Sequence, residues 1–372
     1  MNSDLREPDL PRTAKARTGP LRSGWTTGTC SAAAAKAAAV LLAGGQAPAE
    51  VEVALPAGQR VRFPVERAEA GDGWAEAVVV KDAGDDPDVT HGAHLTVRLR
   101  PSGEPGVTWR AGDGVGTVTK PGLGLEVGGP AINPVPRAQI SRAVGEVLDL
   151  ERVGVVCEIS VPGGERMARK TTNGRLGIVG GISILGTTGV VRPFSTASWQ
   201  ASVVQAVDVI AAQGLDVVVL STGGRTERAA MRLLPDLPEG CFVEVGDFTG
   251  AALRQAVADG LRRCVFVGMA GKLAKLAAGV MMTHWTRSKV DLDALAEVTA
   301  EAGAPGEVVE AVRQANTARH AYELWREHGV ARAPSLLCAR VAANLERFAE
   351  GRLHAEVVMV DFDTLEPVGR AP

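Results

Sequence analysis

The sequence predicts two domains of different classes, an α+β domain followed by an α/β domain with a parallel sheet. Three observations carry this prediction. At 372 residues the chain is long for one domain. Short apolar segments separated by turn residues precede residue 100, whereas strand and helix patterns alternate after residue 198. The stretch 171–193 separates the two patterns. We therefore expect a mobile arm at 1–22, an α+β domain at 23–170 and an α/β domain at 171–365.

Composition argues against several classes of function. The formal net charge is −3, and aromatic residues form 4% of the chain with a single tyrosine, which argues against a nucleic-acid surface. The first 22 residues lack an apolar core and no apolar run approaches about 20 residues, so we expect neither a signal peptide nor a membrane span. The five cysteines form no C-x-x-C pair, which argues against disulfides and zinc. A cytoplasmic protein without its own metal site is expected.

The first ordered element is a helix within GWTTGTCSAAAAKAAAVLLAGG. Thr29 or Ser31 can cap it, and Gly44 ends it. The residues before the alanines then lie at the positive N-terminus, where N–H groups and hydroxyls suit a carboxylate or phosphate. An ordinary helix cap explains the same pattern. The residues concerned are Thr26, Thr27, Gly28 and Thr29.

Four alternating segments follow and predict the sheet of the first domain, at 51–55, 59–65, 74–81 and 93–100. Between the last two, the turn 82–94 contains aspartates and two histidines. Its carboxylates lack the spacing of a calcium loop, so we expect a solvated turn there and not a metal site.

A glycine-rich stretch, 113–137, has almost no helical periodicity but regular apolar residues, which predicts a long ordered loop. This loop would present Lys120, Asn133 and Arg137 to a ligand. A helix at 139–148 and a strand at 153–161 complete the predicted first domain.

The second domain is predicted to open with a buried strand at 176–185, which breaks at Gly186, Thr187, Thr188 and Gly189. Helices at 198–213, 225–233, 249–258 and 273–280 then alternate with strands at 216–220, 242–245 and 264–267. In an open parallel sheet, the carboxyl ends of the strands line the ligand crevice. The predicted cofactor residues at those ends are Gly186, Thr187, Thr188, Gly189, Ser221, Thr222, Gly223, Asp247, Gly268, Met269 and Gly271.

These strand ends lack the motifs of common nucleotide sites. G-x-G-x-x-G is absent and the segment 268–272 lacks Walker A spacing, so a classical dinucleotide or triphosphate site is poorly supported. Asp247 can accept the hydroxyls of a ribose or cap the next helix, and the sequence leaves both readings open.

Between residues 261 and 290 the chain contains basic residues but no Asp or Glu, which favours a small polyanionic ligand over a solvated helix face. Lys272 and Arg287 are the predicted substrate contacts in this run. His284 lies among polar residues nearby, and we keep it, with Asp113, as a candidate catalytic residue.

Four stretches together resemble the cobalt-precorrin-5B C1-methyltransferase family of the oxygen-independent cobalamin pathway. They are GWTTGTCSAAAAKAA, DGVGTVTKPGLG with AINPVPR, TTNGRLGIVGGISILGTTGVVRPFS and GMAGKLAKLAAGVMMTHWTRSKVD. The resemblance runs from about residue 24 to about residue 361.

The resemblance implies methyl transfer from S-adenosylmethionine to carbon 1 of a cobalt-containing tetrapyrrole, giving cobalt-precorrin-6A. It also implies a domain like the second domain of ribosomal protein S5, followed by a Rossmann-like domain. The cobalt would arrive within the substrate. Because the sulfonium methyl group is already activated, few titrating groups are needed, and no catalytic base stands out.

Two other classes of function stay open at this point. GTCSAAAAKAA looks like the phosphate loop of the galactokinase and homoserine kinase superfamily, which predicts a small-molecule kinase but leaves the second domain without a role. A non-enzymatic corrinoid-binding protein is the third reading. Binding of S-adenosylmethionine, compared with ATP, would separate these classes. The sequence leaves the oligomeric state open.

Overall fold

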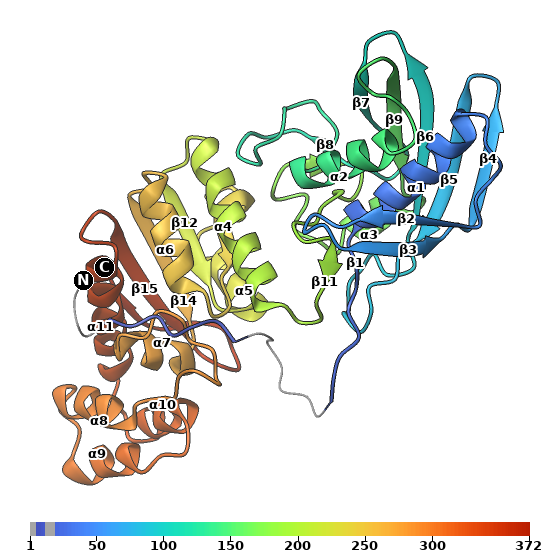
Figure 1. Ribbon diagram of the computed structural model, residues 1–372. Coiled ribbons are helices and arrows are strands. Elements are labelled where there is room, and N and C mark those ends of the chain that lie inside the picture. Colours follow the sequence, from blue (N-terminus) through green and yellow to red (C-terminus); the bar gives the residue numbers. More distant parts are fainter. Residues whose placement is uncertain (1–4, 12–18) are drawn as a thin grey trace. The chain divides into compact units, whose positions relative to one another are not determined.

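The computed structural model describes residues 5–11 and 19–372, which form two compact units. The N-terminal unit is Lys15–Ser195, and the C-terminal unit is Thr196–Pro372 together with Met1–Ala14. Both are mixed α/β structures (Figure 1). The boundary lies at Ser195, so residues 171–195 belong to the first unit and not to the second as we expected.

The N-terminal unit contains three helices and eleven strands in its described part. The helices are α1 (Thr27–Leu42), α2 (Pro134–Gly145) and α3 (Gly164–Ala168). The strands are β1 (Gly24–Trp25), β2 (Glu50–Ala54), β3 (Arg60–Pro64), β4 (Arg67–Gly71), β5 (Trp74–Val80), β6 (His94–Ser102), β7 (Gly106–Ala111), β8 (Thr117–Val118), β9 (Gly154–Ser160), β10 (Ile178–Val179) and β11 (Val190–Val191).

Its main sheet has the order β4-β5-β6-β9-β7, antiparallel except for the parallel pair β7 and β9. Leu95, Val97 and Leu99 alternate along β6 and are buried in one core with the alanines of α1. Alanine side chains are small, so the helix can pack closely on the sheet. The predicted strands 51–55, 59–65, 74–81 and 93–100 are confirmed within one or two residues.

The stretch 176–185 is not the first strand of the parallel sheet, and that prediction is wrong. Within it, β10 pairs with β8, and Ile182 and Ile184 bridge to Val115 and Ile132. The expected close approach of backbones is confirmed, because a Cβ on Gly181 would lie 2.1 Å from the carbonyl oxygen of Gly114. Glycine spacing shows that another backbone lies near, but not which one.

The C-terminal unit contains the remaining elements, which are α4 (Thr196–Ala212), β12 (Val217–Ser221), α5 (Gly224–Leu233), η1 (Glu239–Cys241), β13 (Phe242–Glu244), α6 (Thr249–Ala258), β14 (Arg263–Gly268), α7 (Ala270–Ala277), α8 (Leu292–Glu301), α9 (Gly306–Arg313), α10 (Ala318–Glu327), α11 (Ala333–Phe348), β15 (His354–Val360) and β16 (Pro367–Ala371). The predicted alternation from 198 to 280 is confirmed.

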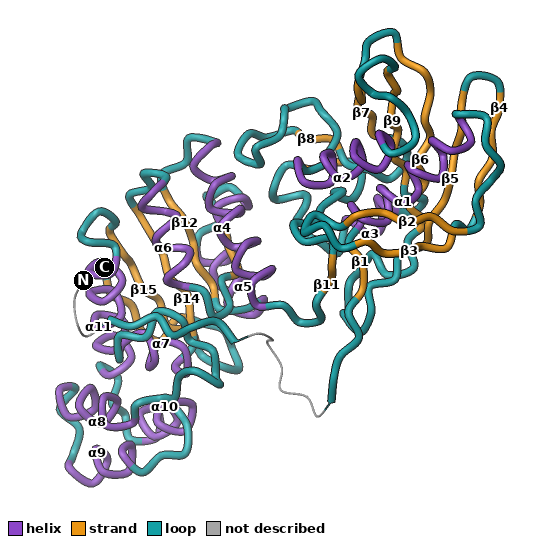
Figure 2. The backbone as a smooth tube through the Cα atoms, in the orientation of Figure 1, coloured by secondary structure: helices purple, strands orange, loops and turns teal. Residues whose placement is uncertain are grey.

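The sheet of this unit has the order β13-β12-β14-β15-β16, with the first four strands parallel and β16 antiparallel. Figure 2 shows β12, β14 and β15 of this sheet. Both faces are buried: Val218 and Leu220 lie in one core with α4 and α6, whereas Val217 and Val219 lie in another with α5. Burial on both faces explains why these strands are continuous apolar runs. The chain leaves β12 toward β13 and returns to β14 on the other side of β12, so the order reverses there.

Residues 5–11 form part of the C-terminal unit, which corrects the expected mobile arm at 1–22. The backbone N–H of Arg6 donates to the carbonyl oxygen of Gly279 (2.9 Å), and that of Met281 donates to the carbonyl oxygen of Arg6 (2.9 Å). Glu7 forms an ion pair with Arg254, and Leu5 and Leu10 pack against the core. The rest of the expected arm within 1–4 and 12–18 lies outside the described residues.

Candidate functional site

The candidate site is the edge of the parallel sheet where β12 and β14 end, between which the strand order reverses. We call it the switch-point edge; it comprises residues 221–224 after β12 and 268–271 before and within α7. Ligands of open α/β sheets bind at such a point. From the sequence we expected a strand that ends at Gly186 to line this crevice beside the strand that ends at Gly268, but the neighbour of β14 at this point is β12.

The turn after β12 is held by Thr226. Its hydroxyl oxygen accepts from the N–H groups of Thr222 (3.0 Å) and Gly223 (3.1 Å), and its hydroxyl group lies 2.8 Å from the carbonyl oxygen of Gly223. The backbone of the turn is thus fixed before any ligand arrives. Helix α5 begins directly behind it at Gly224.

A carboxylate faces this glycine turn. Glu244 is the last residue of β13, and its carboxylate oxygens lie 4.0 and 3.9 Å from where a Cβ on Gly223 or Gly224 would be. An acidic side chain about 20 residues after a glycine turn is the group that accepts ribose hydroxyls in dinucleotide-binding folds. Sequence reasoning missed Glu244, although its distance along the chain from Gly224 offered the signal.

Helix α7 begins at the end of the neighbouring strand. Met269 precedes its first turn and makes no side-chain cap. A Cβ on Gly271 would meet no atom within 4 Å, so there is open space beside this helix start. Two helix N-termini, those of α5 and α7, therefore follow adjacent strands at the switch-point edge.

Asp247 and Lys272, which we assigned to cofactor and substrate, form an ion pair with each other. The hydroxyl of Thr283 also donates to Asp247 Oδ1 (3.0 Å). The carboxylate of Asp247 is therefore engaged by neighbours on other elements, and this pairing favours neither the ribose role nor the helix-capping role that the sequence left open.

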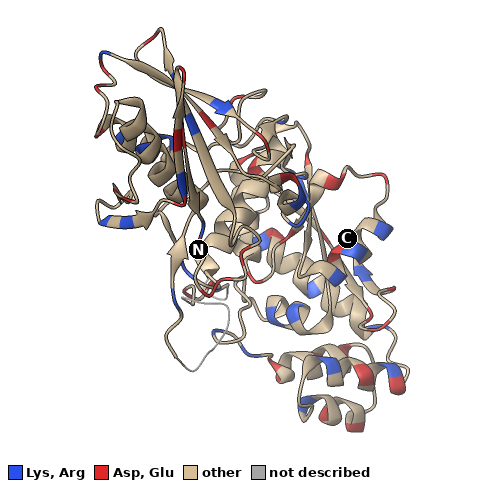
Figure 3. Ribbon diagram, turned by 90° about the vertical axis from the view of Figure 1, so that its right-hand side faces the viewer, with Lys and Arg blue, Asp and Glu red and all other residues tan. Residues whose placement is uncertain are grey.

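The basic run 261–290 does not form one patch. Arg262 and Arg263 lie at the amino end of β14, whereas Lys272 follows its carboxyl end. Lys275 is buried, and burial followed by the charge of Lys272 lowers its pKa below the usual value. Arg287 is exposed. Over the chain as a whole, Lys and Arg positions alternate with Asp and Glu positions from other segments (Figure 3).

The two candidate catalytic residues, His284 and Asp113, differ in their exposure to solvent. His284 is buried, and its Nδ1 lies 2.8 Å from the hydroxyl oxygen of Thr286 and 3.3 Å from the backbone nitrogen of the same residue. Asp113 is exposed and belongs to the N-terminal unit, where its carbonyl oxygen accepts from Val161 N–H (2.7 Å).

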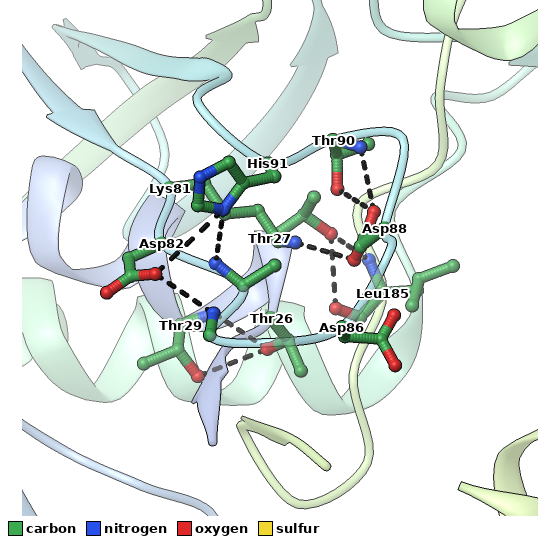
Figure 4. Close-up of polar contacts among 12 residues, drawn as sticks. Thr26, Thr27, Thr29, Lys81, Asp82, Asp86, Asp88, Thr90, His91 and Leu185 are labelled. Atoms are coloured by element: carbon green, nitrogen blue, oxygen red, sulfur yellow. Dashed lines mark hydrogen bonds and ion pairs between the residues drawn. The ribbon is translucent and has the colours of Figure 1, made fainter. Parts of the chain in front are cut away.

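The start of α1 is closed by residues 183–189 (Figure 4). Thr26, and not Thr29 or Ser31, is its N-cap, and its hydroxyl accepts from Thr29 N–H (3.2 Å). The N–H of Gly28 donates to Leu185 O (3.1 Å), and the hydroxyl of Thr27 accepts from Leu185 N–H (2.9 Å). The exposed donors that we expected are thus already paired, and all three threonines are buried.

The turn 82–94 is a structural turn (Figure 4). The N–H of Ala83 donates to His91 Nδ1 (3.1 Å), and the buried ammonium of Lys81 pairs with Asp88 (2.6 Å). The Lys81 charge, opposing the effect of burial, holds the pKa of Asp88 below its usual value. Within residues 5–11 and 19–372, no group of three His, Cys, Asp or Glu side chains is placed to hold a metal ion.

The three polar residues of the loop 113–137 do not converge. Arg137 donates to the carbonyl oxygen of Ile132 (2.9 Å), and burial lowers its pKa. Asn133 is the N-cap residue of α2, but its side chain makes no capping hydrogen bond. Lys120 packs against the backbone of Gly177, where a Cβ would lie 2.5 Å from the Lys120 side chain.

Comparison with known proteins identifies the family. Residues 14–193 match the family described as CbiD, and residues 282–371 match that described as CbiD, C-terminal domain. A relative from Rubrobacter xylanophilus is 68% identical over 99% of this chain and 96% of its own, and one from Methylococcus capsulatus is 53% identical over 92% and 91%. Both bear the name cobalt-precorrin-5B C(1)-methyltransferase. The chain belongs to the CbiD family.

This CbiD chain also matches the 1.9 Å crystal structure of a cobalamin biosynthesis protein (cbiD) from Archaeoglobus fulgidus. The two are 26% identical, the match covers 87% of this chain and 95% of the other, and the TM-score is 0.37. None of the described helices is both long and apolar enough to cross a bilayer.

In this CbiD chain, the predicted cofactor residues other than Asp247, which pairs with Lys272, fall into two groups. Ser221, Thr222, Gly223, Gly268, Met269 and Gly271 lie at the switch-point edge of the C-terminal unit. Gly186, Thr187, Thr188 and Gly189 belong to the N-terminal unit, where a Cβ on Gly186 would lie 2.4 Å from the Thr26 hydroxyl. The second group does not follow a strand of the parallel sheet, so the reason for assigning it to that crevice does not hold.

Proposed function

We propose that this protein is the S-adenosylmethionine-dependent methyltransferase that converts cobalt-precorrin-5B into cobalt-precorrin-6A by methylation at carbon 1. The supporting observation is 68% identity over 99% of the chain to a relative with that methyltransferase name. The finer fold that the resemblance implies, a domain like that of ribosomal protein S5 followed by a Rossmann-like domain, is part of the same proposal. So are the cytoplasmic location and the residue assignments below.

The methyl donor binds at the switch-point edge in this proposal. Glu244 accepts the ribose hydroxyls, while the glycine turn after β12 and the start of α7 surround the rest of the donor. The position of Glu244 beside Gly223 and Gly224 supports this assignment. The donor residues are Ser221, Thr222, Gly223, Glu244, Gly268, Met269 and Gly271.

The substrate carboxylates are bound by exposed polar groups. Arg287 is the assignment in the C-terminal unit because it is exposed, whereas Lys275 is buried and Lys272 is paired. Residues 26–29 are buried in the N-terminal unit, so we assign them no contact with the substrate.

Methyl transfer from a sulfonium group requires few titrating side chains. The sulfonium methyl group is activated by its own charge, so the protein has to align it with the ring carbon and exclude water. Cobalt belongs to the substrate.

Donor binding tests the proposal directly. Calorimetry should show that the purified protein binds S-adenosylmethionine but not ATP. Glu244→Gln should weaken donor binding about tenfold or more, because a hydrogen bond to a charged group contributes roughly 1.5–3 kcal/mol. Glu307→Gln on α9 is the matched control, since Glu307 is exposed and distant in sequence.

ATP binding would support the kinase, and tetrapyrrole binding without donor binding would support a corrinoid carrier.

Gly271 gives a second, steric test. Gly271→Leu can fold because a Cβ there meets no atom within 4 Å, yet the added side chain would occupy space needed by the donor. We expect at least tenfold weaker donor binding with an unchanged melting temperature. Gly306→Leu is the control, because Gly306 also lies in the first turn of a helix and a Cβ on it would likewise meet no atom within 4 Å. Normal donor affinity in a folded Gly271→Leu variant would exclude this placement.

A further inference from the structure

Thr283 and three polar side chains around it form a connected cluster, which we call the clasp. Asp247, Lys272, Lys275 and Thr283 are its members. Lys272 pairs with Asp247 and also donates to the Thr283 hydroxyl (3.1 Å), which itself donates to Asp247 (3.0 Å). Lys275 donates to the carbonyl oxygen of Thr283 (2.9 Å), and the N–H of Thr283 donates to the carbonyl oxygen of Asp247 (3.1 Å). Every backbone and side-chain polar group of Thr283 is thereby used.

The clasp joins loops from two separate strands. Asp247 follows β13, whereas Lys272 and Lys275 lie on α7 after β14, and β12 lies between these strands. Neighbouring strands are about 4.8 Å apart, so β13 and β14 are separated by roughly 10 Å. The clasp therefore connects the two sides of the switch-point edge across the end of β12.

Burial and charge make the clasp costly as a purely structural feature. It contains two ammonium groups and one carboxylate, and Lys275 is buried. Burial lowers the pKa of Lys275, with a further contribution from the charge of Lys272. The Lys272–Asp247 pair is partly exposed, so it adds little to stability, whereas the buried ammonium of Lys275 is directed at the carbonyl oxygen of Thr283. The main effect of the clasp is therefore to fix the position of Thr283.

The segment fixed by the clasp is the turn 283–288. The hydroxyl of Ser288 donates to His284 O (3.0 Å), and the N–H groups of Arg287 and Ser288 donate to the same oxygen (both 2.9 Å), so the turn is closed on itself. On its other side, Met281 is hydrogen-bonded to Arg6 of the N-terminal segment. Arg287 and Trp285 are exposed on this turn.

We infer that the clasp positions the turn 283–288 so that Arg287 meets a carboxylate of the tetrapyrrole, with Lys275 and Thr283 as positioning residues. This inference rests on the proposed function, since it takes Arg287 as a substrate contact. In this inference, Asp247 and Lys272 help to hold the turn 283–288 in position and do not bind the ligand directly. The clasp acts on substrate affinity and leaves the glycine turn and Glu244 unchanged.

Two measurements on Thr283→Val, which keeps the shape and removes the hydroxyl, test the inference. Amide hydrogen exchange of residues 283–288 should become about tenfold faster or more. The KM for the tetrapyrrole should rise about tenfold, while the donor affinity from calorimetry stays within about twofold. Thr283→Ser should restore both values, because serine keeps the hydroxyl. Thr317→Val, which removes a helix-capping hydroxyl of α10, should change neither.

A double variant shows whether the clasp acts through Arg287. If it does, Thr283→Val combined with Arg287→Ala should have the KM of Arg287→Ala alone, because the positioned group is already absent. The matched control for the cation is Lys289→Ala, two residues further on and also exposed. Independent, multiplying effects of the two changes would overturn the positioning role.

The outcomes separate this inference from the proposed function. Unchanged hydrogen exchange in Thr283→Val overturns the clasp regardless of any activity. Faster exchange with an unchanged KM also overturns it, because the clasp would then only hold the fold. If the unaltered protein neither binds S-adenosylmethionine nor turns over substrate, the proposed function fails and the inference with it, even where exchange confirms the clasp. Should Thr283→Val not fold, Lys275→Met replaces it and the same two readouts decide.

Discussion

Two carboxyl groups in the C-terminal unit share a hydrogen bond. Asp208 on α4 and Asp259 at the end of α6 come together, and the pKa of Asp208 rises to about 6, first through burial and then through the charge of Asp259. The folded protein binds the Asp208 proton more tightly than the unfolded chain does. At low pH, where both states carry this proton, the carboxyl pair does not lower the free energy of unfolding. As the pH rises from about 4 through about 6, the free energy of unfolding decreases.

Asp208→Asn should therefore stabilise the protein above pH 6. An amide can donate to Asp259 without a second negative charge. We expect a gain of about 1 kcal/mol at pH 7.5, which is less than the full pKa shift implies because the pair is partly exposed to solvent. The melting temperature should rise by about 2–4 °C, and the difference from the parent should vanish at pH 4. Asp236→Asn, at an exposed site, is the control; an equal gain at both pH values would contradict the shared proton.

At the scale of elements, the N-terminal segment 5–11 adds a strand-like strip to the C-terminal unit. Its two backbone hydrogen bonds flank Arg6, and Leu5 and Leu10 cover part of the core. The polar composition of the first 22 residues concealed this contact, because the binding groups are backbone atoms and two isolated leucines. Backbone pairing leaves almost no signal in side-chain composition.

Deleting residues 1–11 should destabilise the C-terminal unit by about 3 kcal/mol. Two hydrogen bonds contribute about 1 kcal/mol each, and partial burial of two leucines contributes a similar amount. Urea unfolding would measure the loss. Arg6→Ala is the control, since the Arg6 side chain is exposed and its backbone makes the contact; this variant should be near neutral. A deletion variant with parental stability would show that the segment does not bind in solution.

At this scale, the sequence also did not predict how the start of helix α1 is capped. The alanine-rich helix was expected to begin near Thr29, yet α1 begins at Thr27. Residues 183–189 supply its hydrogen-bond partners, and they are more than 150 residues away in the sequence. A local pattern could show that the helix end needs partners, but not that a distant loop already provides them.

At the scale of the whole molecule, the two units have separate hydrophobic cores. Calorimetric unfolding should therefore show two transitions, and S-adenosylmethionine should raise only that of the C-terminal unit. At one hundred times the dissociation constant, the stabilisation is about 2.7 kcal/mol. Leu99→Ala, in the N-terminal core, identifies the other transition by lowering it by roughly 2–5 kcal/mol. A donor shift in the transition that Leu99→Ala lowers would place the donor in the other unit.

The sequence alone determined the class of both units, most strands and helices between residues 51 and 280, and the family. These features follow from local periodicity and from long motifs, and both can be identified without knowing which residues are in contact. Tertiary structure alone decided that residues 171–195 join the first unit, that Asp247 pairs with Lys272, and that Glu244 faces the glycine turn. Each of these facts depends on which distant segments come together. Strand order and packing decide which distant segments come together, and the spacing of residues along the chain does not show this.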